Sequence, residues 1–295
     1  MNWIPNALAL LVVCLDPMTL SAAEPAAPQP GLNNPFFAFD NGTGRGKLSP
    51  DEQAKMLEEL GYAGIGYTGT GNIPQMLAAL DRHGLQMYST YVWARIGPDG
   101  PSYDPGLPEA IKQFKGRNTL IWLTIQGSVP DGTAPDGDTQ AVNVVREIGD
   151  MAKESGLRVA LYPHLGFYVS TTEDGIRIAK KADRKNVGTS LNLCHWLKEG
   201  DEPGMERLIE AAMPHLFVVS INGADHQGGW DRLIQTLDRG EFDVYRFLAT
   251  LKKHSYGGPV GLQCYAVKGD KRENLARSIG AWRKFQERMA AEKPQ

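Results

Sequence analysis

Short apolar runs alternate with amphipathic segments along most of this chain, from Asn34 to about residue 290. The apolar runs are rich in β-branched and aromatic residues, and each is about as long as one strand of a parallel sheet. Each is followed by a segment with the apolar spacing of a helix. The eight predicted strands are residues 35–40, 64–67, 86–92, 119–125, 158–163, 188–193, 216–221 and 259–265.

Helix signals support this division. The first predicted helix has Ser49 as its N-cap, Pro50 at its first position and Glu52 three residues after Ser49, which is the spacing of a capping box. Further helices are predicted to begin at Thr171, Asp138 and Asp243. Eight strand–helix units within residues 34–290 are the size and order of a (β/α)8 barrel, so we predict an α/β TIM barrel that forms one domain.

An open, doubly wound sheet is the main alternative fold. Such sheets usually carry a glycine-rich phosphate loop after the first strand, and residues 41–46 are rich in glycine. The loop is short and contains Arg45, followed by Lys47, which fits a dinucleotide-binding turn poorly. The barrel is therefore favoured.

Composition and charge narrow the range of possible functions. The chain is 42% hydrophobic and 22% charged, as expected of a soluble globular protein, and its formal net charge is −3. Lys and Arg residues are scattered rather than clustered, so nothing predicts a nucleic-acid partner.

The N-terminus predicts export. Residues 7–15 are apolar, and Ser21 and Ala23 are the small residues that precede a signal-peptidase cleavage site. Asp16 interrupts the apolar stretch, and no Lys or Arg precedes it. We predict a signal peptide at residues 1–23, a Pro- and Ala-rich linker at 24–33, the barrel at 34–290 and a tail at 291–295, hence a periplasmic or secreted protein. The apolar run is shorter than the roughly 20 residues of a membrane-spanning helix, so no stable membrane span is predicted.

Cysteine content predicts no disulfide framework. Only Cys194 and Cys264 lie beyond the predicted signal peptide, both in apolar runs, and we expect two buried free thiols.

Candidate chemistry lies at the predicted strand ends, because the carboxyl ends of the strands form the active face of such barrels. The last four strands carry most of it. The candidates there are Tyr162, His164, Asn192, His195, Trp196, Ser220, Asn222, Asp225, His226 and Gln263, with Asp40 and Tyr67 at the ends of the first two strands.

The endings Leu161-Tyr162-Pro163-His164 and Leu191-Asn192-Leu193-Cys194-His195 resemble those of the xylose-isomerase-like sugar isomerase and epimerase superfamily. The resemblance extends from Asn34 to about Arg288 and implies a (β/α)8 barrel that acts on sugars. Members bind a divalent metal through two Glu, one Asp and one His at the ends of strands five to eight. The resemblance places Tyr162, Asn192, Ser220 and Gln263 at these positions, while His164 and His195 match accessory histidines of the family.

The four replacements change the expected chemistry. Mg²⁺ and Mn²⁺ need anionic oxygen ligands, whereas Asn and Gln offer neutral carbonyls. We therefore predict no metal cofactor. The alternative is a divalent metal, Zn²⁺ or Mn²⁺, bound by His164, His195, Asp225 and His226.

We predict an isomerase- or epimerase-type enzyme for a monosaccharide or small glycoside, including oxidised ones, that transfers a proton next to a carbonyl. The predicted catalytic residues are His164, His195 and Tyr162, with Tyr162 as an acid because an ordinary tyrosine is a weak base at neutral pH. The predicted substrate-binding residues are Asn192, Gln263, Ser220, Asn222, Trp196, Asp40 and Tyr67. The alternatives are a non-catalytic carbohydrate-binding barrel and a sugar lyase or hydrolase. The pattern predicts no oligomeric state.

Overall fold

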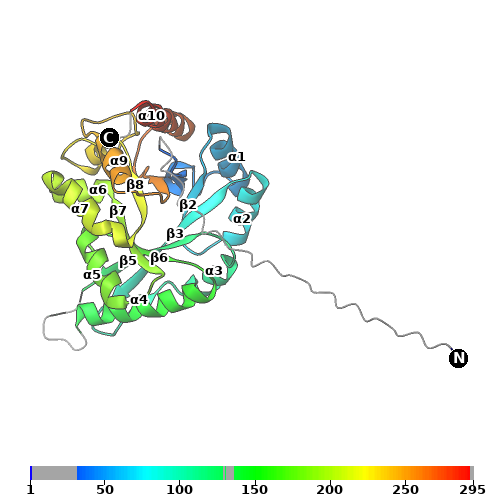
Figure 1. Ribbon diagram of the computed structural model, residues 1–295, viewed down its shortest axis with the longest axis vertical. Coiled ribbons are helices and arrows are strands. Elements are labelled where there is room, and N and C mark those ends of the chain that lie inside the picture. The colour runs from blue at the N-terminus through cyan, green and yellow to red at the C-terminus, as the bar shows by residue number, and fades with distance from the viewer. Residues whose placement is uncertain (2–31, 129, 131–135, 293–295) are drawn as a thin grey trace. The chain divides into compact units, whose positions relative to one another are not determined.

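The computed structural model describes residue 1 and residues 32–128, 130 and 136–292. Eight parallel strands in this part of the chain close into a barrel, because β2 pairs with both β1 and β3 while β1 pairs with β9. Helices surround the strands (Figure 1). The strands are β1 Phe36–Phe39, β2 Gly64–Thr68, β3 Gln86–Ile96, β4 Ser102–Tyr103, β5 Leu120–Gly127, β6 Val159–Leu161, β7 Val187–Asn192, β8 Leu216–Ile221 and β9 Val260–Leu262.

Each predicted strand is confirmed, and the TIM barrel is therefore the observed fold. The short β4 was not predicted; it pairs antiparallel with the end of β3, which extends to Ile96. The helices are α1 Pro50–Leu60, α2 Ile73–Arg82, α3 Leu107–Gln113, α4 Gly137–Glu154, α5 Thr172–Ala182, α6 Leu193–Glu199, α7 Met205–Ala212, α8 Trp230–Leu233, α9 Val244–Lys253 and α10 Lys271–Ala291. Single 3-10 turns lie at Asp40–Gly42, Glu202–Gly204 and Met213–His215.

Helix starts follow local capping chemistry. The Ser49 side chain and the Glu52 side chain form the predicted capping box at α1. Thr171 and Asp243 cap α5 and α9 as predicted. The predicted start at Asp138 is wrong by two residues, because the Asp136 carboxylate accepts from the Thr139 N–H and caps α4.

Side chains alternate between the two faces of β1. Phe36 faces outward and stacks on Trp282 of α10, with ring centroids 4.2 Å apart. Phe37 faces the barrel interior, where it stacks on Tyr88 at 5.0 Å. Gly261 on the neighbouring strand makes room for the interior rings, since a Cβ there would lie 2.5 Å from Phe39. The barrel interior is thus a packed aromatic core below the site.

Apart from residue 1, the predicted signal peptide lies outside the described residues, as do most of the predicted linker and residues 293–295 of the predicted tail. No helix in the described part of the chain combines the length and apolarity needed to cross a membrane. Cys194 and Cys264 are buried free thiols, as predicted.

Candidate functional site

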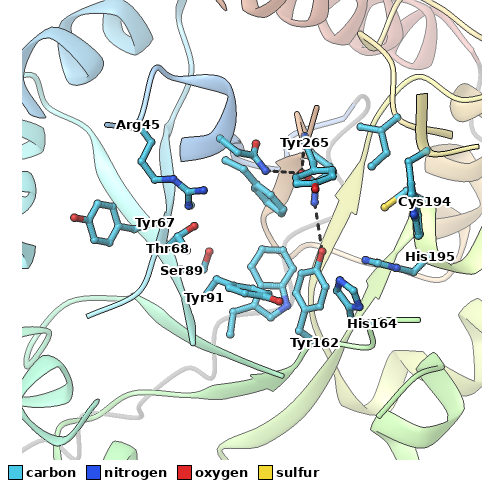
Figure 2. A pocket seen from close by; sticks show the side chains of 17 residues that line it. Arg45, Tyr67, Thr68, Ser89, Tyr91, Tyr162, His164, Cys194, His195 and Tyr265 are labelled. Atoms are coloured by element: carbon cyan, nitrogen blue, oxygen red, sulfur yellow. Dashed lines mark hydrogen bonds between the residues drawn. The ribbon is translucent and has the colours of Figure 1, made fainter. Parts of the chain in front are cut away.

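A cavity of about 360 Å³ opens at the carboxyl ends of the barrel strands. This volume is within the range of roughly 300–1,000 Å³ of small-molecule sites. Figure 2 shows Tyr162, His164, Cys194 and His195 on one side of the cavity and Arg45, Tyr67, Thr68 and Ser89 on the other. The lining side chains are mainly aromatic or neutral polar: Phe39, Asn41, Arg45, Tyr67, Thr68, Ser89, Tyr91, Trp122, Tyr162, His164, Cys194, His195, Trp230, Ile234, Gln263 and Tyr265.

Gln263, just beyond β9, organises one wall. Its Oε1 accepts hydrogen bonds from Asn41 Nδ2 at 2.8 Å and from the backbone N–H groups of Cys264 and Tyr265 at 3.0 Å. Three donors around one atom identify that atom as the amide oxygen. The Gln263 Nε2 therefore faces Tyr162 and donates to its Oη at 3.4 Å. This leaves the Tyr162 hydroxyl proton available for a ligand.

Tyr162 is kept in its protonated form. Its ring is buried between Tyr91 and Trp122, each with a centroid 5.0 Å away. Burial raises the pKa of Tyr162 well above the ordinary value, although the hydrogen bond from Gln263 opposes the shift. Tyr162 is thus a hydrogen-bond donor at neutral pH.

His164 and His195 both hydrogen-bond to the backbone of one residue, Leu165. His164 Nδ1 lies 2.9 Å from the Leu165 carbonyl oxygen, which can only accept, so Nδ1 carries the proton. His195 Nδ1 accepts from the Leu165 N–H at 3.4 Å, so the neutral ring carries its proton on Nε2. The two neutral rings therefore have opposite tautomers: His164 has a free lone pair on Nε2, and His195 has an Nε2–H donor.

A tight turn after β6 positions the backbone of Leu165. Gly166 has φ +86°, a left-handed conformation that favours glycine, and it lets the chain turn back directly after Leu165. Phe167 then stacks on the His164 ring with centroids 4.0 Å apart. The His164 and His195 rings are 4.2 Å apart, and the Trp230 ring contacts His195 edge-on at 5.3 Å.

Both histidines are neutral at physiological pH. Burial lowers the pKa of His164, and burial together with the neighbouring His164 lowers the pKa of His195 to about 3. A neutral imidazole with a free nitrogen can accept a proton, and one with an N–H can polarise a carbonyl.

Other predicted binding residues form a buried layer behind the cavity. Asn192 donates from Nδ2 to the Pro163 carbonyl at 2.8 Å and accepts from Ser220 at 3.1 Å and Ser190 at 3.4 Å. Asn222 donates to two backbone carbonyls, those of Gly223 and Leu233. The structure therefore places Asn192, Ser220 and Asn222 outside the cavity lining, where they connect strand ends.

Trp196, which was predicted to bind substrate, also lies outside the cavity lining. Helix α6 begins at Leu193, so His195 and Trp196 point about 100° apart rather than alternating as in a strand. Trp196 is buried against Phe242 and Phe247, and Trp230 lines the cavity instead. This corrects the prediction for Trp196.

Asp40 supports the opposite wall without lining it. It is buried and binds Arg45 and Thr68, which do line the cavity. Tyr67, which was predicted to bind substrate, lines the cavity. Arg45, Ser89, Tyr91 and Tyr265 were not predicted as site residues; Arg45 lies in the glycine-rich loop that was considered only as a phosphate loop.

The donor set fits a divalent metal poorly. No Asp or Glu among the described residues lines the cavity, and these residues contain no group of three or more His, Cys, Asp or Glu placed to bind a metal. In the alternative zinc set, Asp225 pairs with Arg232, and His226 pairs with Glu202 at 2.7 Å on the surface. Burial raises the pKa of Cys194 to about 12, so its thiol is protonated.

Comparison with protein-family profiles identifies one matching family. The profile of the family described as xylose isomerase-like TIM barrel matches residues 54–285. No curated protein sequence matches the chain.

Solved structures show the same fold at low identity. An IOLI protein with a bound zinc atom is 15% identical with a TM-score of 0.68, over 87% of this chain and 99% of that one. D-allulose 3-epimerase from Methylomonas sp. is 16% identical with a TM-score of 0.67, over 87% of this chain and 100% of that one. 3-keto-D-glucoside 4-epimerase from E. coli is 15% identical with a TM-score of 0.63, over 85% of this chain and 99% of that one.

Proposed function

The chain belongs to the xylose isomerase-like TIM barrel family, and we propose that it is an isomerase-type enzyme for a monosaccharide or small glycoside. It transfers a proton next to a carbonyl, and the signal-like residues 1–23 direct it to the periplasm or the medium. The observation that carries the proposal is the pair of neutral histidines of opposite tautomer, His164 and His195, facing one cavity with Tyr162.

The residues divide the chemistry between them. His164 Nε2 takes the proton from the carbon next to the substrate carbonyl. Tyr162 and His195 Nε2–H donate hydrogen bonds to the carbonyl oxygen as it gains negative charge, which is worth most in a cavity that excludes water. His164 then returns the proton to the former carbonyl carbon on the same face. At the same time the hydroxyl on the first carbon gives its proton, directly or through Tyr162, to the former carbonyl oxygen, so that the first carbon becomes the new carbonyl.

One free base favours isomerisation over epimerisation. Inversion at a carbon needs a proton acceptor on one face and a donor on the other, whereas transfer between neighbouring carbons needs only one face. His164 has the one imidazole lone pair that is free to act on a ligand, because His195 Nδ1 is occupied by the Leu165 N–H. Two of the related structures are sugar epimerases, whereas among the described residues that line this cavity His164 is the one that offers a free basic nitrogen.

The mechanism works without a divalent metal. The family's metal chemistry would require anionic ligands, and the neutral donor set described above supports a metal-free site. No step of the proposed reaction depends on one.

The cavity also suits a hydroxylated ring. Asn41 Oδ1 is a buried acceptor with no partner among the described residues, and it can accept from a sugar hydroxyl. Aromatic faces provide stacking surfaces for the apolar faces of a ring. Tyr265, 59% exposed at the cavity, offers a further surface for the second unit of a glycoside.

The same observations are compatible with two other functions. The absence of acidic side chains from the described lining is also compatible with a barrel that binds sugar without turnover. Proton removal next to a carbonyl is also the first step of a lyase, or of a hydrolase acting on oxidised sugars.

Solvent deuterium exchange tests the proposal. Purified protein is incubated in D₂O with ketohexoses and 3-keto-glucosides, and deuterium next to the carbonyl is followed by NMR. We expect exchange with at least one sugar and a loss of about 10²- to 10⁴-fold in His164→Ala. His215→Ala is the matched control, since His215 precedes β8 at the opposite end of the barrel, and it should exchange at the wild-type rate. Sugar binding without any exchange would favour the non-catalytic barrel.

A further inference from the structure

Arg45 is the one side chain with a full charge at neutral pH among the described residues that line the cavity. It lies across the cavity from His164 and His195 (Figure 2). A single guanidinium in an otherwise neutral wall is a specificity element, because it distinguishes an acidic ligand from a neutral one of the same shape.

Asp40 holds Arg45 in place. Arg45 Nη1 donates to Asp40 Oδ1 at 3.1 Å, and the same carboxylate accepts from the Thr68 backbone N–H and hydroxyl at 2.8 Å each. Asp40 is only 1% exposed, so it cannot turn toward the cavity. The other guanidinium N–H groups of Arg45 have no acceptor within the described part of the chain and can donate to a ligand.

Ser89 provides a second donor on the same wall. It is 1% exposed, and its hydroxyl is buried without a hydrogen-bond partner among the described residues, which is costly unless a ligand or water supplies one. Ser89 pairs with Gly66 on β2, two residues before Thr68. A Cβ at Gly66 would lie 3.1 Å from the Ser89 oxygen, so the glycine leaves room beside this hydroxyl, and Ser89 is among the residues that line the cavity.

We infer that Arg45 and Ser89 form a carboxylate subsite and that the substrate is a sugar acid, bound with its carboxylate at Arg45 and its carbonyl toward Tyr162. This rests on the proposed function and specifies its substrate class. Arg45 supplies the paired donors that suit a planar carboxylate, and the Ser89 hydroxyl supplies a further donor. A phosphate dianion fits less well, because Arg45 is the one cationic side chain among the described residues of the lining.

Calorimetric titration with matched probes tests the subsite. The probes are D-glucuronate with D-glucose, D-galacturonate with D-galactose, and D-glucose 6-phosphate. In the wild type, we expect at least one acid to bind tenfold or more tightly than its neutral partner. Arg45→Gln should bring the ratio of acid to neutral-sugar affinity close to one, and Ser89→Ala should lower this ratio.

Two further variants control for charge and folding. Arg95 lies near the carboxyl end of β3, at the same end of the barrel, but does not line the cavity. Arg95→Gln should therefore keep the wild-type ratio of acid to neutral-sugar affinity. Arg45→Lys keeps the charge without the planar fork and should keep only part of the ratio. Thermal unfolding checks that each variant is folded.

The outcomes separate the subsite from the proposed reaction. Three results would each overturn the subsite and leave the proposed reaction unaffected. They are equal affinity for neutral and acidic sugars, an acid preference that is retained in Arg45→Gln, and tighter binding of the phosphate than of the acids. An Arg45-dependent acid preference in a protein that exchanges no proton would support the subsite and contradict the reaction. No binding of any probe would count against both.

Discussion

The backbone N–H and C=O groups of Leu165 assign different chemical roles to two neighbouring histidines. Its carbonyl accepts from His164, and its N–H donates to His195, so one ring presents a base and the other a donor. Burial lowers the pKa of both rings and keeps them neutral. Two identical side chains thus become complementary through their hydrogen bonds rather than through their positions in the sequence.

This arrangement predicts an unusual pH dependence. The reaction needs unprotonated His164, and an unperturbed histidine with a pKa of 6.5 would be only about one quarter unprotonated near pH 6. Because burial lowers the pKa of His164, we expect the acidic limb of the kcat/KM profile to be centred below pH 6.5. A pH–rate profile checks this. An acidic limb centred at or above pH 6.5 would contradict the role given to His164.

At the scale of residues, the sequence predicts that the histidines lie at the barrel mouth but does not predict their hydrogen-bond partners. Tyr162, His164 and His195 were predicted from strand-end position and family resemblance, and all three line the cavity. The tautomers depend on the backbone of Leu165, and the orientation of Gln263 depends on Asn41 from another strand end, so neither can be inferred from residue type. Ser89 cannot be distinguished from the other serines in the sequence, because its lack of a hydrogen-bond partner among the described residues is visible only in the structure.

At the scale of elements, Asn192 connects the end of β7 to the segment after β6. Its Nδ2 donates to the Pro163 carbonyl, a bond that an ionised carboxylate cannot make. The residue that resemblance matched to an Asp ligand therefore has a structural role that requires the amide. This explains why an amide suits the position without any reference to a metal.

Replacing Asn192 by Asp tests that role. A buried carboxylate facing a carbonyl loses the donor, so we expect the free energy of unfolding to fall by roughly 2–4 kcal/mol at neutral pH. Burial would raise the folded-state pKa of the new carboxyl above its unfolded value, so the loss should shrink as pH falls toward about 4. Urea unfolding at several pH values measures it. The exposed Asn143→Asp in α4 is the control and should change stability by less than about 0.5 kcal/mol; equal stability of Asn192→Asp and wild type at pH 7 would contradict the role.

Strands were easier to predict than the segments that follow them. Eight short apolar runs bounded by polar residues and glycines define the barrel, because each strand is buried on both faces. The prediction for Trp196 was wrong because the strand β7 passes directly into α6 at Leu193, without an intervening loop. That change of period from strand to helix is not marked by a Pro, a Gly or a capping side chain.

At the scale of the whole molecule, the site exists only because the barrel closes. Asn41, Tyr162 and Gln263 come from the ends of β1, β6 and β9, and closure brings them into one hydrogen-bonded wall. Arg45 faces the histidines across the same cavity (Figure 2). The sequence predicts which strand ends share a face, but convergence across the barrel is a property of the closed sheet.

The central claim is that this barrel transfers a proton with His164, His195 and Tyr162 and without a divalent metal. The most direct measurement is the deuterium exchange rate of one protein sample before and after chelator treatment, with its metal content determined by elemental mass spectrometry. We predict an unchanged rate in the metal-free sample and no increase when Mn²⁺ or Zn²⁺ is added. A rate that is lost on chelation and restored by either metal would contradict the account.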